Sequence, residues 1–382
     1  MTERLFDTDS HLLSFEARVL CCEQSGAGFL VELDATAFAP EAGGQPSDIG
    51  VLGDARVLDV KEQGDVLLHV TDRALPVGAC VVGEVDRMRR LRHLQNHTGE
   101  HIVTGLFYRE YGMSNVGFHL GHEDVTLDLD GSVDFSMMRR IEYLANLAVA
   151  ENRAVRILYP AEKELETLFY RSKGEIEGRV RIVEIEGLDR CACCVPHVKA
   201  TGEVGGIRLL SAMRYKGGTR IHMKCGLDAL AHSNIQQDRE SELSQLLSLP
   251  PERIVDGVKK LSEDFAAVKY RLVEIKREKI RDCIDGLDAS QKKTCFFEKD
   301  FDVNELRMLV SGAVEKTGGL CAAFSLAGEE YRFVLADLGG TFEQTAARFR
   351  AAFEIKGGGK PPYLQGTLSA SEQELRGFFN QI

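Results

Sequence analysis

The sequence predicts an α+β fold: an N-terminal β-barrel-like subdomain, a helix-on-sheet α+β domain, a helical coiled linker and a small C-terminal α/β domain. Residues 15–85 hold short apolar runs separated by glycine, proline and aspartate, a pattern typical of an all-β unit. Helical and strand periodicities alternate in the next stretch, and a heptad repeat begins at Ile254. These changes divide the chain into four expected parts: residues 1–90, 91–232, 233–288 and 289–382.

Individual elements follow from the spacing of the apolar residues. In the first part, strands are expected over residues 29–34 and 65–70, where short apolar runs are bounded by turn residues. A helix is expected over residues 85–108, because its apolar positions recur at broadly helical spacing. The second part should add a strand over residues 125–129, a helix over 134–150, and strands over 155–159, 179–185, 207–213 and 220–222.

Composition narrows the class of protein. The chain has 382 residues, of which 44% are hydrophobic, and a formal net charge of -12. No run approaches the roughly 18 apolar residues of a membrane span, and the acidic start does not resemble a signal peptide, so we expect a cytoplasmic protein without membrane contact. The ten cysteines are then expected to be thiols or ligands. Because the net charge is negative, the protein as a whole repels the phosphate backbone, and a nucleic acid would have to bind to a local cluster of basic residues.

Two short stretches could together bind a metal ion. His97 and His101 are four residues apart, which on a helix places both imidazoles on one face. Cys193 and His197 are also four residues apart and could hold the same ion from a loop. A His/His/Cys/His set suits one Zn²⁺, because imidazole and thiolate fit a borderline-soft, tetrahedral cation.

A histidine pair at this spacing is more often two ordinary surface or core residues, so the prediction depends on the second stretch. Cys191, Cys193 and Cys194 crowd the four positions 191–194 just before His197, and such density favours metal or thiol chemistry. Cys193 is chosen as the ligand for its four-residue interval to His197. Cys191 and Cys194 remain alternatives.

Three motifs in order, the last of them continued by residues 201–205, resemble the editing domain of alanyl-tRNA synthetases and of their free-standing relatives, the AlaX trans-editing proteins. The resemblance covers roughly residues 10–230. One motif, Cys-Cys-Val-Pro-His, departs from the family's usual Cys-Gly-Gly-Thr-His. The motifs are residues 33–45 (Leu-Asp-Ala-Thr-Ala-Phe-Ala-Pro-Glu-Ala-Gly-Gly-Gln), 97–101 (His-Thr-Gly-Glu-His), 193–197 (Cys-Cys-Val-Pro-His) and 201–205 (Thr-Gly-Glu-Val-Gly).

The resemblance implies a zinc-dependent deacylase that hydrolyses serine, or glycine, from mischarged alanine tRNA. The alternatives are a non-catalytic tRNA-binding protein with a structural zinc, and an unrelated zinc hydrolase such as a peptidase. The peptidase alternative is disfavoured because no glutamate follows His97 directly. An ester hydrolase needs a water nucleophile and stabilisation of the oxyanion, and zinc can supply either. Four protein ligands would, however, leave a tetrahedral ion without a vacant position.

Candidate substrate and catalytic residues come from the first two motifs. Thr36 and Gln45 flank Gly43-Gly44 and could face a bound aminoacyl group, with Thr36 reading the serine hydroxyl. A plain turn is the commoner reason for two glycines, and Thr36 could be an ordinary strand residue. Glu100 could orient water, support a ligand or point into solvent.

Four arginines stand directly before the metal-binding histidines, so a tRNA phosphate could be met close to the ion. The other interpretation is a solvated helix end. The four are Arg87, Arg89, Arg90 and Arg92.

A sustained heptad predicts a coiled seam of about three heptads. It could form a homodimer, which we favour, or an intramolecular hairpin with residues 241–249. The seam positions are Ile254, Val258, Leu261, Phe265, Val268, Leu272 and Ile275.

The last part is expected to contain helices over residues 303–315 and 342–353 and strands over 320–326 and 331–336. Three glycines then stand between Lys356 and Lys360, which could offer backbone N–H groups and charge to phosphate or form an ordinary loop. This part resembles the C-terminal DHH-associated domain of alanyl-tRNA synthetases. The whole chain is therefore similar to the long form of AlaX, without a nucleotide-binding aminoacylation module.

Overall fold

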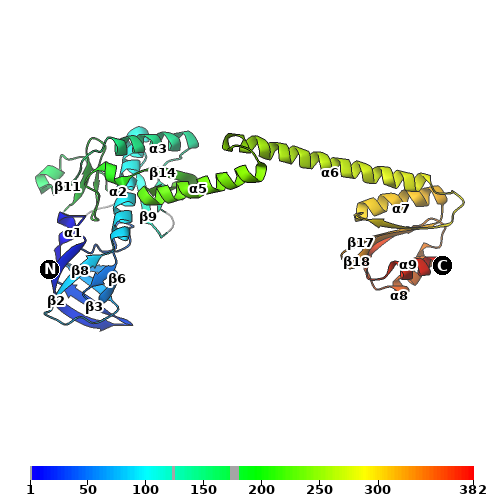
Figure 1. Ribbon diagram of the computed structural model, residues 1–382, viewed down its shortest axis with the longest axis horizontal. Helices are drawn as coiled ribbons and strands as arrows, with labels where there is room; N and C mark the ends of the chain where they lie inside the picture. Colours follow the sequence, from blue (N-terminus) through cyan, green and yellow to red (C-terminus); the bar gives the residue numbers. More distant parts are fainter. Residues whose placement is uncertain (1, 123–124, 173–179) are drawn as a thin grey trace. The chain divides into compact units, whose positions relative to one another are not determined.

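The computed structural model describes residues 2–122, 125–172 and 180–382. The chain divides into two compact units, Met1–Glu242 and Leu243–Ile382, and each is described here by itself (Figure 1). Within the described residues, the first unit contains a closed barrel and a two-stranded, a three-stranded and a four-stranded sheet, and the second contains a five-stranded sheet. The expected α+β class is confirmed. The finer division into four parts stays a prediction.

The N-terminal strands close into a barrel in the order β2-β3-β7-β6-β5-β8. Strands expected over residues 29–34 and 65–70 are present as β3 and β7. Side chains along β7 alternate between buried and half-buried, as expected where one face of a strand lines an apolar core. The barrel strands are β2 (Ser14–Ser25), β3 (Gly28–Leu33), β5 (Gly50–Leu52), β6 (Ala55–Gln63), β7 (Val66–Thr71) and β8 (Cys80–Val85).

Helix α2 (Arg87–Tyr111) follows the barrel and carries the first histidine pair. Its N-cap residue Asp86 accepts a hydrogen bond from the backbone N–H of Arg89, and the helix ends at Gly112 in the left-handed region (φ 67°). Every residue from His93 to Phe107 is buried, and the last turn is not. Gly99 permits this close packing, because a Cβ there would lie 2.3 Å from the Sγ of Cys225.

The helix packs against two antiparallel sheets, one in the order β14-β15-β10-β9 and a smaller one in the order β11-β12-β13. Helix α3 (Phe135–Ala150) packs against α2 and β14. These elements agree with the expected ones, except that residues 173–179, which include the expected start of one strand, lie outside the described residues. The strands are β9 (Asn115–Leu120), β10 (Val125–Leu129), β11 (Val155–Leu158), β12 (Ile182–Ile185), β13 (Asp189–Ala192), β14 (Ile207–Tyr215) and β15 (Gly218–Cys225).

The first unit also has several short elements: β1 (Glu3–Arg4) and β4 (Ala35–Thr36), which pair in parallel, α1 (Leu5–Thr8), α4 (Glu162–Leu165) and the 3-10 turn Thr201–Val204. The 3-10 turn Pro251–Arg253 lies in the second unit.

The second unit has helices on both faces of its sheet, which runs in the order β16-β17-β18-β20-β19. One core lies under α6 and α7, and a second lies under α8 and α9, with alternate residues of β17 and β18 in each. The elements are α6 (Ile254–Asp285), β16 (Lys293–Lys299), α7 (Val303–Thr317), β17 (Leu320–Ala327), β18 (Glu330–Asp337), α8 (Phe342–Ala352), β19 (Ile355–Gly358), β20 (Tyr363–Leu368) and α9 (Glu372–Gln381).

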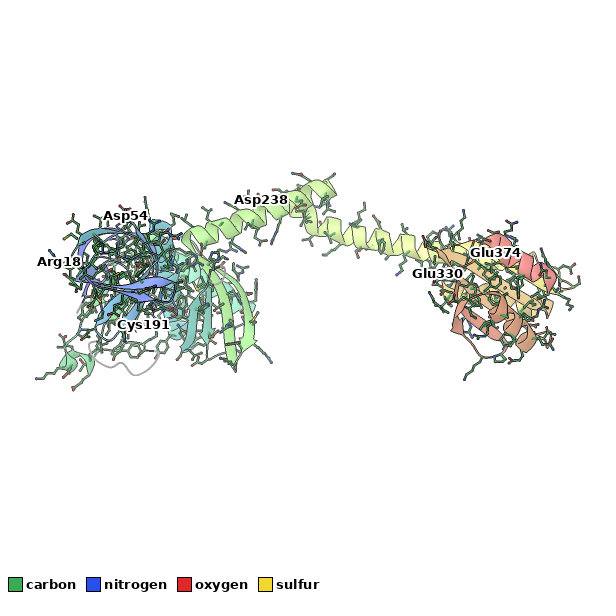
Figure 2. All side chains as sticks on the ribbon, turned by 90° about the horizontal axis from the view of Figure 1, so that it is seen from below. Arg18, Asp54, Cys191, Asp238, Glu330 and Glu374 are labelled. Atoms are coloured by element: carbon green, nitrogen blue, oxygen red, sulfur yellow. The ribbon has the colours of Figure 1, made fainter. Side chains whose placement is uncertain are left out.

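The long helices differ in detail from expectation. Residues 241–249 are not a separate short helix, because α5 runs from Gly226 to Leu247. Its end packs on the start of α6, where a Cβ on Gly257 would lie 2.4 Å from Leu249 Cδ1. Further along α6 the seam is exposed, with Phe265 70% and Val268 68% accessible, and Figure 2 shows side chains projecting from the middle of this helix. Across the described residues, no helix has both the length and the apolar character to cross a bilayer.

Candidate active site

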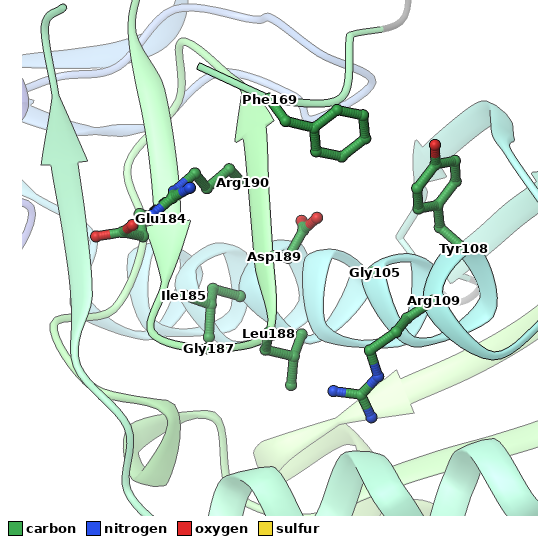
Figure 3. A pocket seen from close by; sticks show the side chains of 10 residues that line it. All are labelled: Gly105, Tyr108, Arg109, Phe169, Glu184, Ile185, Gly187, Leu188, Asp189 and Arg190. Atoms are coloured by element: carbon green, nitrogen blue, oxygen red, sulfur yellow. Dashed lines mark hydrogen bonds and ion pairs between the residues drawn. The ribbon is translucent and has the colours of Figure 1, made fainter. Parts of the chain in front are cut away.

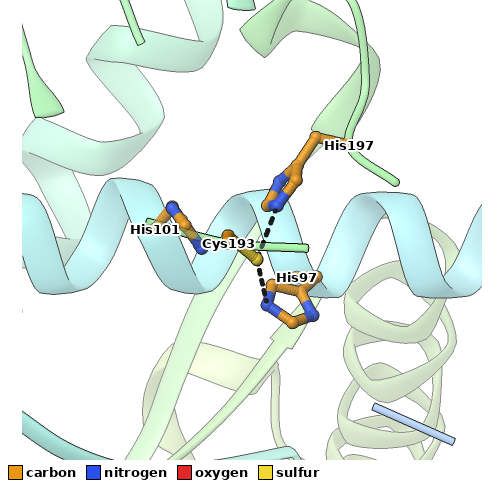
Figure 4. Close-up of side chains that lie close together, drawn as sticks. All are labelled: His97, His101, Cys193 and His197. Atoms are coloured by element: carbon orange, nitrogen blue, oxygen red, sulfur yellow. Dashed lines mark hydrogen bonds between the residues drawn. The ribbon is translucent and has the colours of Figure 1, made fainter. Parts of the chain in front are cut away.

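Four side chains from the two predicted metal-binding stretches meet in the first unit (Figure 4). His97 and His101 project from α2, and Cys193 and His197 come from the loop after β13. One candidate ligand atom from each of the four lies within 4.8 Å of the others. The Sγ of Cys193 is 3.6 Å from His97 Nε2 and 3.3 Å from His197 Nε2. The structure therefore brings the whole predicted His/His/Cys/His set together.

Two neighbours orient the imidazoles beside Cys193. Gln45 Oε1 can only accept, so His97 Nδ1 donates to it at 3.0 Å and His97 Nε2 carries the lone pair that faces the thiol. Thr98 Oγ1 lies 3.1 Å from His197 Nδ1 and also accepts from the Val198 N–H, which ties this loop to α2. Such outer contacts fix ring orientation in histidine metal sites.

The third histidine, His101, lies between two carboxylates. Its Nε2 is 3.7 Å from Glu100 Oε2, and its Nδ1 is 3.8 Å from Asp189 Oδ2. Glu100 is 1% exposed and accepts a hydrogen bond from Asn115, so the interpretation in which it points into solvent is wrong. Asp189 is held by both nitrogens of an Arg171 fork, at 2.8 and 2.7 Å.

Protonation of the cluster is consistent with cation binding. Burial lowers the pKa of His197 well below its usual value, which keeps the ring neutral and able to ligate. Burial raises the pKa of the Cys193 thiol to about 12, so a nearby cation is needed to hold it as thiolate. Neutral imidazoles and one thiolate are the donor set that zinc prefers, and the residues present fit that ion.

The two alternative cysteines lie differently. Cys194 is exposed, and Cys191 is buried in a second possible donor group with His101 and Asp189. The Arg171 fork already neutralises the Asp189 carboxylate. This second group is therefore the weaker one for a cation.

The motif at residues 33–45, called the glycine motif below for its Gly43-Gly44 pair, reaches the cluster from the barrel side. Gly43 and Gly44 both have positive φ, 59° and 81°, which strains any other residue. A Cβ on Gly43 would lie 3.5 Å from His97 Cε1, and one on Gly44 would lie 2.2 Å from the Phe118 carbonyl oxygen. The two glycines thus do more than form a turn, because they bring Gln45 and bare backbone against His97.

Thr36 is fully buried and its hydroxyl is engaged. It accepts from the Phe38 N–H at 3.1 Å and lies 2.8 Å from His69 Nε2. Burial lowers the pKa of His69 to about 4, so the ring is neutral. The predicted serine-reading residue therefore belongs to a hydrogen-bonded pair in the barrel.

The arginine cluster in the first turns of α2 separates into surface and buried members. Arg87 is exposed, and Arg89 is half-buried with its Nε donating to the Ser47 carbonyl at 2.9 Å. Arg92 pairs with Asp228 at 2.7 Å. Arg90 is 2% exposed and pairs with Asp48 at 2.5 Å, so its prediction as a phosphate contact is wrong. Arg90 holds the glycine motif in place instead, because its Nη2 also donates to the Ala37 carbonyl oxygen at 2.6 Å.

The C-terminal lysines lie in the second unit. Lys356 and Lys360 are both exposed, and Lys356 pairs with Glu330 at 2.9 Å. The glycine segment is not wholly a loop, because Gly357 pairs with Gly366 between β19 and β20. A tRNA contact there stays a prediction.

Sequence reasoning missed several residues around the cluster. Thr98 stands inside the His-Thr-Gly-Glu-His motif, so its position was a usable signal. No signal in the sequence indicates the roles of Asn115, Arg171 and Asp189, because these roles depend on strands that the fold brings together. His69 lies in a predicted strand, but nothing in the sequence indicates its pairing with Thr36.

The sequence is similar to several known proteins. Residues 180–222 match the Threonyl and Alanyl tRNA synthetase second additional domain. Alanine–tRNA ligases from Ignicoccus hospitalis and Pyrococcus abyssi are 32% and 31% identical over 75% and 78% of the chain, which spans about a third of their length (33% and 34%). The alanyl-tRNA editing protein Aarsd1-A of Xenopus laevis is 28% identical over 91% of the chain and 86% of its own length.

The chain therefore contains the second additional domain of threonyl and alanyl tRNA synthetases, and Cys193 and His197 lie within it. It is a homologue of the alanyl-tRNA editing protein Aarsd1 and of alanine–tRNA ligases, as expected of an AlaX-like alanyl-tRNA editing protein. The resemblance seen in the sequence is confirmed.

Proposed function

We propose that the protein is a zinc-dependent deacylase that releases serine, with glycine as the second candidate, from mischarged alanine tRNA. The single observation that carries this proposal is the convergence of His97, His101, Cys193 and His197 beside the glycine motif. The homology to alanyl-tRNA editing proteins supports the substrate class.

Zinc, when bound, would supply a Lewis acid for the ester carbonyl or a water of lowered pKa. The chain's own residues orient the site. Gln45 fixes the His97 ring, and Thr98 fixes the His197 loop. Glu100, buried beside His101 and held by Asn115, is placed to position a water or to support the ligand. Gly43 presents bare backbone beside His97, where the ester end of the substrate would lie, and Gly44 allows this turn to pack against the Phe118 backbone.

Selectivity for serine is assigned to Thr36. Its hydroxyl proton is directed at His69 and one lone pair is filled by the Phe38 N–H, so a remaining lone pair would accept from the serine hydroxyl. Alanine offers no such donor, and a pocket built for a hydroxyl rejects the analogue that lacks it.

The partner is tRNA, met near the site by Arg87, Arg89 and Arg92 and, in the second unit, by Lys356 and Lys360. Phosphate contacts of this kind position the nucleic acid without reading its sequence. We place the reaction in the cytoplasm, where charged tRNA is used.

A homodimer is proposed from the exposed seam of α6. Leu261, Phe265, Val268 and Leu272 are each between 52% and 70% exposed at heptad spacing. A second copy of this helix would cover them.

A second candidate function is tRNA binding with a structural zinc. The observation that favours it is the presence of four protein donors, because a closed tetrahedral site leaves no position for water.

The two functions are separated by incubating the purified protein with alanine tRNA charged with serine, glycine or alanine. We expect selective release of serine, loss of release with a chelator, and recovery with zinc. Tight tRNA binding without release of any amino acid would favour the structural alternative. The variant Cys193→Ala, which lacks one candidate ligand, is tested in the same assay. Cys80→Ala is its matched control, because Cys80 is an exposed cysteine of the barrel.

A further inference from the structure

Two aromatic rings, Tyr108 and Phe169, stack at the surface of the first unit and line the pocket drawn in Figure 3. Tyr108 stands near the end of α2, and Phe169 comes from the irregular segment after α4. Their centroids are 5.9 Å apart with planes at 27°, yet they remain 37% and 64% exposed. Large exposed rings forgo the free energy of burial, so a stacked pair on a surface suggests a ligand.

The pair borders two hollows. The larger has a volume of about 340 Å³ and an apolar lining that includes Gly105, Ile185 and Leu188. The smaller, about 180 Å³, has polar lining residues that include Ser114 and Asn115. Tyr108 and Phe169 line both. A flat ring placed against either aromatic face would therefore have apolar contact on one side and polar groups nearby.

Both hollows adjoin the histidine cluster. Asp189 lines the larger one, and its Oδ2 is 3.8 Å from His101 Nδ1. Asn115 lines the smaller one and donates to Glu100, whose Oε2 is 3.7 Å from His101 Nε2. The aromatic pair thus lies on the His101 side of the cluster, whereas the glycine motif lies on the His97 side.

The charges around the pair are compensated. Arg190 pairs with Glu184 at 2.6 Å, and Arg109 pairs with Glu110 at 3.2 Å. Asp189 is neutralised by its Arg171 fork. A phosphate would find no unpaired cation among these groups. A neutral, planar ligand suits the surroundings better.

We propose that Tyr108 and Phe169 form the stacking site for the terminal adenine of the tRNA 3′ end. This inference rests on the proposed function: an amino acid esterified to the last ribose and presented to the cluster places its own base within one nucleotide of that cluster. Unpaired bases at RNA ends are commonly held by stacking on aromatic side chains. The glycine motif then serves the amino acid, and the aromatic pair serves the base.

Phe169→Ala and Tyr108→Ala test the assignment on serine-charged tRNA. We expect KM to rise roughly 5-fold to 150-fold with little change in kcat, the range that loss of one base stack implies. Hydrolysis of a seryl ester without a base should not change. The salt dependence of tRNA binding should keep its slope, because no charge is removed. Phe169→Tyr should retain the affinity. Tyr143→Ala is the matched control, since Tyr143 is a 70% exposed aromatic on α3.

A binding readout separates this inference from the proposed function. Replacing the terminal adenine by 2-aminopurine should give fluorescence quenching with the wild-type protein and not with Phe169→Ala. If the wild-type protein binds tRNA but releases no amino acid, the deacylase proposal fails while the quenching still reports on the stack. Unchanged KM and quenching in both alanine variants would overturn the stacking site, and so would an equal loss of activity on the ester that lacks a base.

Discussion

The Thr36 hydroxyl donates its proton to His69 Nε2 across 2.8 Å. The direction is set by the other side of the ring, where His69 Nδ1 lies 3.1 Å from the Val31 carbonyl oxygen, which can only accept. The Phe38 N–H completes the pair by donating to Thr36 Oγ1. A residue chosen for substrate selectivity is therefore also a buried hydrogen-bond partner.

Thr36→Val keeps the shape and removes the hydroxyl. It should narrow the serine-to-alanine preference roughly 5-fold to 150-fold and also lower the free energy of unfolding by about 1–3 kcal/mol, because His69 Nε2 loses its donor. Single-turnover rates on both charged tRNAs and urea unfolding measure the two effects. Thr36→Ser is the control that retains the hydroxyl. Equal slowing on both substrates, or on neither, would show that discrimination lies elsewhere.

His69 should make stability depend on pH. Its folded pKa, about 4, lies below the ordinary histidine value of 6.5, so the unfolded chain binds a proton that the folded chain excludes. The contribution is intact above about pH 6.5 and is lost as pH falls toward 4, by on the order of 3 kcal/mol. Urea unfolding of the wild type and His69→Gln from pH 7 to pH 4 measures it. Identical pH dependence in the two proteins would contradict the prediction.

Zinc content should follow the cluster. Alanine variants of His97, His101, Cys193 and His197 should lose the metal, while Cys194→Ala should retain it. Gln45→Leu should weaken zinc affinity roughly 10-fold to 100-fold, because the His97 ring loses the acceptor that orients it. Metal analysis and chelator competition measure both. Full zinc in the Cys193 variant together with loss in the Cys194 variant would refute the chosen ligand.

The arginines in the first turns of α2 should behave in two ways. Arg87→Ala should reduce the salt slope of tRNA binding by about one unit with little effect on stability, because Arg87 is exposed. Arg90→Ala should instead destabilise the fold by about 3–5 kcal/mol, since the buried Asp48 carboxylate loses its guanidinium partner. Binding titrations at several salt concentrations and urea unfolding distinguish them. If Arg90→Ala reduced the salt slope of tRNA binding and left the free energy of unfolding unchanged, the structural role of Arg90 would be contradicted.

The α6 seam should govern self-association. Phe265→Glu places a charge in the centre of the heptad stripe and should convert a dimer into a monomer in analytical ultracentrifugation. Lys269→Glu, an exposed change outside the seam, is the control. A wild-type monomer at micromolar concentration would exclude the dimer.

The sequence by itself determined the α+β class, most element positions and the two pairs of candidate ligands, because apolar periodicity and four-residue spacing are local properties. His97 and His101 share a face of any helix, whatever surrounds it. Tertiary structure decided that Arg90 is buried, that Glu100 faces His101, and that Tyr108 stacks on Phe169. Those outcomes depend on which strands and loops pack against α2, and no local pattern records a contact between residues far apart in the chain.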